Sequence, residues 1–174
     1  IDIIIVHQDI ASNTWKTDGS GREVLKETIK MHFENGVVNI ETTFTALEPV
    51  EIRKWYFLQG HHKTNGLGSG GIRYIGGDAN RGINSMDEAS NGGDLFAKTM
   101  RFLSTTLQME MNMEDYDLGR LTHNGSETYA AFVADYTTYS KGYFKPVFDT
   151  VNPLVLDTGE SASARGSYRF GIFE

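Results

Sequence analysis

The chain has 174 residues, with 16 basic and 23 acidic side chains and a formal charge of −7, and this length suits one domain with its own hydrophobic core. It contains no cysteine, which excludes disulfide scaffolds, thiolate nucleophiles and cysteine-based zinc sites. The acidic balance argues against nucleic acid as a partner, because phosphate contacts need a basic face. No apolar run approaches the roughly 20 residues that a membrane-spanning helix requires.

The clearest pattern is alternation with a period of two over residues 25–33 and 38–44, on either side of Asn35-Gly36. Asn-Gly between alternating runs is typical of a type I′ hairpin turn, in which both central residues need a positive φ. Three cross-strand pairs then fall on one face: Phe33–Val38, Met31–Ile40 and Ile29–Thr42. The sequence therefore predicts a half-buried β-hairpin here.

A second alternating run covers residues 103–113 and ends in Met109, Met111 and Met113, which we interpret as core side chains. Further strands are predicted at residues 1–6, 50–58, 72–75, 129–136, 143–148 and 167–173. The apolar phase shifts within residues 50–58, which suggests a bulge or a strand covered on both faces. Residues 85–103 form the one segment with helical character, because Asp87 and Glu88 suit the first turn of a helix.

Eight or nine short strands separated by turn residues predict an all-β fold. We expect an antiparallel β-sandwich of the jelly-roll type with few helical residues, organised as a single domain over residues 1–174.

The candidate site is the glycine-rich segment 60–93, which holds ten of the 19 glycines. Long loops of this kind usually carry function or move. Aromatic rings can stack on the C–H face of a pyranose, while carboxylate, amide, guanidinium and imidazole groups bind its hydroxyls. The predicted ligand-binding set is Trp55 and Tyr74 for stacking, with His61, Asn65, Arg73, Asp78 and Arg81 for hydrogen bonding. For each residue alone, a place in the core or on the solvated surface is the competing interpretation.

Cofactor motifs are incomplete. A G-x-G-x-x-G pattern starts at Gly66, but a strand rather than a helix is predicted to follow it, so we expect no dinucleotide. A calcium ion held by Asp78, Asn80 and Asp87 is an alternative to an Asx-rich turn, which we favour. We therefore predict no cofactor and no metal.

Two stretches of strand-like sequence, residues 38–52 and 55–59, are followed later by residues 143–145, 159–160 and 165–170. This pattern resembles the β-sandwich modules of phage tail-fibre and tailspike proteins and of secreted carbohydrate-active esterases. The resemblance implies glycan recognition, or presentation of a neighbouring catalytic domain.

Three tripeptides, at residues 51–53, 59–61 and 143–145, resemble in the same order the motifs of jelly-roll alginate lyases. That resemblance implies that His61 and Tyr143 act as base and acid in a β-elimination, while Arg53 and Gln59 neutralise the uronate carboxylate. Gly60 replaces a branched apolar residue of the family's second motif.

The function expected from the sequence is a non-catalytic module that binds or presents glycans, in a secreted or virion-associated protein. Its partner would be a carbohydrate or a cell-surface glycan, and its location extracellular, at the cell surface or on a virion. A polysaccharide lyase acting on uronate polymers is one alternative. A structural assembly protein of a virion, working as a homo-oligomer or in a larger parent assembly, is the other.

Overall fold

The computed structural model describes residues 1–62, 72–76, 87–88, 93–102, 108–116, 130–135, 139–149 and 151–171. All regular elements in these ranges are β-strands, and all their pairings are antiparallel. In chain order the strands are β1 (Asp2–Ile10), β2 (Glu23–Glu34), β3 (Val37–Ala46), β4 (Val50–Ile52), β5 (Lys54–His62), β6 (Ile72–Gly76), β7 (Asp87–Glu88), β8 (Gly93–Phe102), β9 (Gln108–Tyr116), β10 (Ala130–Asp135), β11 (Ser140–Phe148), β12 (Leu154–Leu156) and β13 (Ser161–Gly171). The described residues contain no helix that could cross a membrane.

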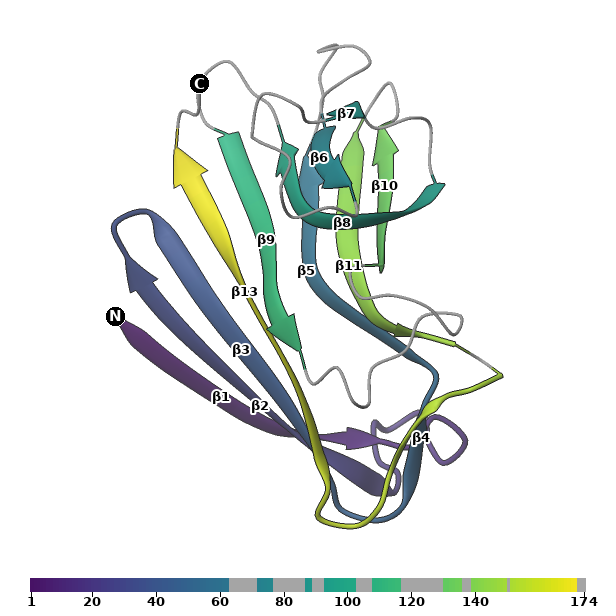
Figure 1. Cartoon of the computed structure of the whole chain (residues 1–174). Helices are drawn as coiled ribbons and strands as arrows, with labels where there is room; N and C mark the ends of the chain where they lie inside the picture. The colour runs from purple at the N-terminus through teal and green to yellow at the C-terminus, as the bar shows by residue number, and fades with distance from the viewer. Residues whose placement is uncertain are drawn as a thin grey trace.

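The main sheet runs in the order β1-β2-β3-β13-β9-β8-β10-β11-β5, with β6 added beside β8. Strand β8 belongs to two layers, because its first residues pair with β10 and its last residues pair with β9 and β6. The sheet therefore turns at β8, and β10, β11 and β5 form a second layer beside the broad layer of β1, β2, β3, β13 and β9 (Figure 1). The antiparallel β-sandwich is confirmed; the jelly-roll subtype is not.

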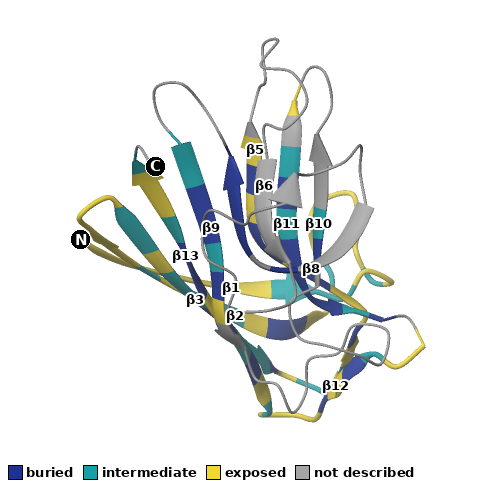
Figure 2. Ribbon diagram, turned by 45° about the horizontal axis from the view of Figure 1, so that its top comes forward, coloured by how far each residue is buried: buried dark blue, intermediate teal, exposed yellow. Residues whose placement is uncertain are grey.

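The hydrophobic core fills the space where the two layers face each other. Two glycines show how closely they approach. A methyl group on Gly60 of β5 would stand 2.7 Å from Phe102 and Met109 of the first layer, and one on Gly166 of β13 would stand 2.6 Å from Leu58 of β5. Figure 2 shows buried residues along β9 and the facing strands, whereas exposed residues prevail on β1.

The hairpin predicted at Asn35-Gly36 is confirmed. Both residues have positive φ angles, 50° and 77°, as the turn requires. All three predicted pairs occur in the register of β2 and β3: Phe33–Val38, Met31–Ile40 and Ile29–Thr42.

The helical expectation for residues 85–103 is wrong, because the segment contributes β7 and β8. Strand β8 is covered on both faces. Met100 and Phe102 are fully buried in the core, while Thr99 and Arg101, which point the other way, are buried as well. The end of β8 therefore keeps the apolar–polar alternation of a strand, although its polar side chains are buried.

The phase shift predicted within residues 50–58 has two sources. The chain leaves a short ribbon of β4 and β12 at Arg53 and enters β5 one residue later. A bulge follows at Leu58, and it shapes the surface described next.

Candidate functional site

The bulge in β5 determines which side chains face outward on the second layer. Leu58 has a positive φ of 48°, and the register with β11 shifts there, from Gln59 opposite Tyr143 to Phe57 opposite the next residue of β11. Phe57 and Leu58 are therefore both buried, whereas Tyr56 and Gln59 on either side of them are exposed.

Aromatic rings cover the outer surface of β5, β11 and β10. Tyr56 is 48% exposed and meets Tyr143 edge to face, with ring centroids 5.0 Å apart. Tyr143 stacks on Phe132 at 5.1 Å, and Phe148 lies 6.4 Å from Tyr56 on the other side. We define the β5–β11 face as the surface formed by Tyr56, Gln59, His61, Phe132, Tyr139, Lys141, Tyr143 and Phe148.

One end of the β5–β11 face is hollowed. The hollow has a volume of about 290 Å³ and is lined by Gln59, His61, Tyr139 and Lys141. His61 and Lys141 are opposite each other in the register of β5 and β11, and the His61 ring packs edge-on against Tyr139 at 4.9 Å. An amide, an imidazole and an ammonium group thus stand beside aromatic surface, which is a combination of hydrogen-bonding and stacking groups that suits a sugar ring.

Lysines give the β5–β11 face a positive character within a chain of net charge −7. The Lys141 ammonium lies 5.2 Å from the Tyr143 ring centroid, and that of the exposed Lys54 lies 5.3 Å from that of Phe148. The Lys145 ammonium also lies 4.3 Å from the Phe148 centroid, but Lys145 is only 2% exposed and adds no surface charge. Cations held over rings in this way remain close to any acidic group that approaches the face.

Tyr168 fixes the backbone beneath the hollow. Its hydroxyl, on β13 of the first layer, donates a hydrogen bond of 3.0 Å to the carbonyl of Gln59 in the second layer. Burial raises the pKa of the Tyr168 hydroxyl to about 12, and the hydrogen bond only partly opposes this.

Trp55, predicted to stack on a ligand, lies in the core. It is 5% exposed, and its ring packs against Phe44 and Phe57, with centroids 4.8 and 6.3 Å away. Its faces are covered by the protein's own side chains, so the core interpretation describes this residue. The exposed ring beside it, Tyr56, was not among the predicted contacts.

The remaining predicted residues are dispersed or lie outside the described residues. His61 is exposed on β5, whereas Arg73 and Tyr74 occupy β6, which pairs with β8 in the first layer. Asn65, Asp78 and Arg81 lie outside the described residues, as does Asn80 of the calcium alternative, whose Asp87 falls on β7. These roles stay predictions.

The residues implied by the lyase resemblance are partly brought together. Gln59 and Tyr143 are directly opposite each other, and His61 follows on the same side of β5. Arg53 precedes β5 and lies 3.2 Å from Glu51, six residues away from Gln59 along an extended strand. The structure thus groups three of the four residues.

The first layer contains a buried ion pair and, elsewhere, a hollow. Cross-strand register places Arg73 opposite Arg101, and Arg101 opposite Glu110. The Arg101 guanidinium donates two hydrogen bonds, of 2.6 and 3.0 Å, to the Glu110 carboxylate, and both side chains are buried.

A hollow of about 390 Å³ crosses β1, β2, β3, β13 and β9. It is lined by Asp2, Ile3, Ile4, Lys30, Met31, His32, Asn39, Ile40, Glu41, Glu114, Arg165 and Gly166. None of the described residues that line it is a phenylalanine, tyrosine or tryptophan, so the β5–β11 face is the better site for stacking.

Comparison with known proteins gives a fold and no family. No family model and no curated protein matches the sequence. The chain is similar in structure to a candidate aldose 1-epimerase of Escherichia coli K12, with a TM-score of 0.53 and 9% identity over 99% of this chain and 66% of that one. It also matches the Slr1438 protein of Synechocystis sp. PCC 6803, with a TM-score of 0.45 and 10% identity over 98% of this chain and 61% of that protein. The chain thus spans about two thirds of these longer structures, and the first likeness supports the β-sandwich fold alone.

Proposed function

We propose that this chain is a carbohydrate-binding module whose β5–β11 face holds the glycan. The observation that carries the proposal is the pair of the exposed Tyr56 and the half-buried Tyr143, next to the hollow lined by Gln59, His61 and Lys141. Sugar sites need apolar ring surface and hydrogen-bonding groups side by side, and this face offers both.

The lysines favour an acidic glycan over a neutral one. Lys54 and Lys141 stand at opposite ends of the aromatic array, so carboxylates spaced along a polymer would find a cation at each end. A uronate-containing polysaccharide is therefore the preferred ligand class. The name of the Escherichia coli neighbour, which refers to a sugar-converting enzyme, is consistent with a carbohydrate ligand.

A second candidate function is a uronate lyase, favoured by the juxtaposition of Gln59, His61 and Tyr143 on one face. In that case the imidazole and the phenol would exchange protons with the substrate during β-elimination. The position of Arg53, paired with Glu51, speaks for binding without this chemistry.

The test is binding of uronate polymers by calorimetry, with unsaturated product followed by ultraviolet absorbance. Tyr56→Ala and Tyr143→Ala should each weaken binding up to about tenfold, since an aromatic contact contributes roughly 0.5–1.5 kcal/mol. Trp15→Ala is the matched control, because Trp15 is 63% exposed and lies outside the β5–β11 face. Product formation that Tyr143→Phe abolishes, with binding retained, would replace the module by the lyase. Equal affinity in all three alanine variants would refute the proposed face.

A further inference from the structure

A histidine and two carboxylates converge on the open edge of the first layer, away from the β5–β11 face. His7 and Asp9 lie two residues apart on edge strand β1, and Glu27 is directly opposite His7 on β2. All three side chains therefore project from the same face of the sheet. Their donor atoms lie within 4.8 Å of one another.

Both carboxylates approach the same ring nitrogen. The Nε2 atom of His7 is 2.7 Å from Oε2 of Glu27 and 3.4 Å from Oδ1 of Asp9. Ligands bound at about 2.0–2.2 Å to one ion stand roughly 3–4 Å apart, so small side-chain rotations would place all three around a common centre.

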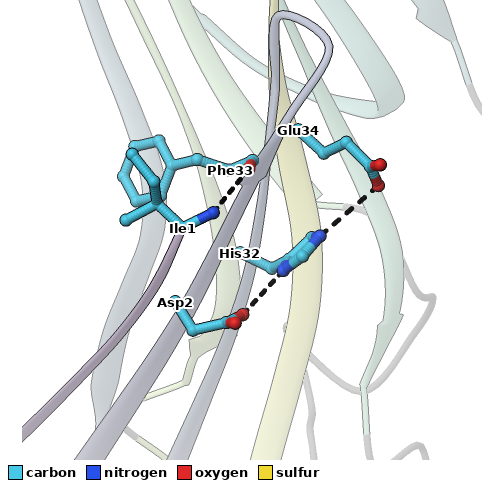
Figure 3. Close-up of polar contacts among 5 residues, drawn as sticks. All are labelled: Ile1, Asp2, His32, Phe33 and Glu34. Carbon is cyan, nitrogen blue, oxygen red and sulfur yellow. Dashed lines mark hydrogen bonds and ion pairs between the residues drawn. The ribbon is translucent and has the colours of Figure 1, made fainter.

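His32 shows the arrangement that cannot bind one ion. It too has two carboxylate neighbours, but Asp2 contacts Nδ1 at 2.6 Å and Glu34 contacts Nε2 at 3.5 Å (Figure 3). The two carboxylates lie on opposite sides of the ring, so no point is close to all three groups. Hydrogen bonds to Asp2 and Glu34 also raise the pKa of His32, which favours the imidazolium, a form that cannot ligate a metal.

Glu27 occupies a setting in which a cation would be favourable. Its side chain is only 16% exposed, and its carboxylate lies within 4.8 Å of the carboxylate of Asp9. A divalent ion placed between the two carboxylates would balance the charge of both.

We propose that His7, Asp9 and Glu27 form a binding site for a divalent transition metal, best suited to Zn²⁺. One nitrogen and two carboxylate oxygens are ligands that zinc accepts, with the fourth tetrahedral position left to water. Calcium is excluded by the nitrogen, since it takes oxygen ligands. The ion would cross-link the edge strand β1 to β2 and so stabilise the first layer at its open edge.

The test is calorimetric titration of the metal-free chain with ZnCl₂, with thermal unfolding measured in parallel. One zinc ion per chain should bind to the wild type and raise its Tm. Glu27→Gln and Asp9→Asn should each lower the affinity at least about tenfold, because even groups behind the ligands contribute that much. His32→Gln is the matched control and should bind as the wild type does, and CaCl₂ should not compete.

Two results would overturn the proposal. One is the absence of a one-to-one complex with the wild type. The other is a zinc affinity that Glu27→Gln and Asp9→Asn leave unchanged but His32→Gln abolishes. Both carboxamide variants keep the size and shape of the side chain, and a metal-free Tm near the wild-type value would show that each has folded.

Discussion

Substitution of Gly166 by alanine tests how the second layer sits on the first. Its added methyl group would stand 2.4 Å from the backbone oxygen of Asn112 and 2.6 Å from Cδ1 of Leu58. Side-chain contacts of this kind essentially never fall below 3.0 Å, so the added methyl group must move by about 0.6 Å away from the Asn112 oxygen and by about 0.4 Å away from Leu58. Leu58 could turn away, but the Asn112 oxygen belongs to the β9 backbone. Overpacking of a core costs about 1–3 kcal/mol, and we expect a loss near the upper end of that range.

The assay is urea unfolding of Gly166→Ala beside Gly159→Ala. Gly159 has a φ of 83° with no atom within 4 Å of the added carbon, so its substitution should cost only the left-handed strain of about 1 kcal/mol. We expect a larger drop in the urea midpoint for Gly166→Ala, with an unchanged m-value. A Gly166→Ala variant as stable as the wild type would refute the close approach of Gly166 to the β9 backbone and to Leu58 described above, because alanine is otherwise the better strand residue.

Two further predictions concern buried polar groups. Glu110→Ala should cost about 3–5 kcal/mol in the free energy of unfolding, because it removes the buried carboxylate that accepts two hydrogen bonds from the buried guanidinium of Arg101. Glu41→Ala, which removes the exposed partner of Lys30, should cost less than about 1 kcal/mol, and equal losses for the two variants would contradict this. The pKa of Tyr168 is about 12 in the folded state and about 10 in the unfolded state. The contribution of the Tyr168 hydroxyl to the free energy of unfolding is therefore complete below pH 10 and declines as the pH rises toward 12. Between those values the wild type should lose up to about 2 kcal/mol more than Tyr168→Phe in urea unfolding, and parallel pH profiles would show that the Tyr168 hydroxyl is not buried.

The hairpin of β2 and β3 could be predicted to the residue because all its determinants are local. Asn35-Gly36 specifies the turn, and the alternation on both sides fixes the register once the turn is placed. Strand β8 was missed for another reason. Its residues 99–102 alternate between polar and apolar side chains, but the acidic pair Asp87-Glu88 ahead of them suggested the first turn of a helix.

The candidate site was predicted in part, and the reason lies in the bulge of β5. Gln59, His61 and Tyr143 were recognised from short motifs, and the register brings them onto one face. Simple alternation from Trp55 could not reveal that Leu58 shifts the phase, because a positive φ at a leucine has no local sequence signal. Trp55 is therefore buried, and Tyr56 presents the exposed ring. The histidine and carboxylates at residues 7, 9 and 27 were missed for a similar reason, since the pairing of β1 with β2 joins them across the sheet.

The measurement that tests the central claim most directly is a glycan array, including uronate polymers, probed with the wild type, the double variant Tyr56→Ala/Tyr143→Ala, and Trp15→Ala. The account predicts specific binding by the wild type and by Trp15→Ala, strongest on acidic glycans, and loss of the signal in the double variant at an unchanged Tm. A blank array for the folded wild type, or a signal that the double variant retains, would contradict carbohydrate binding at the β5–β11 face.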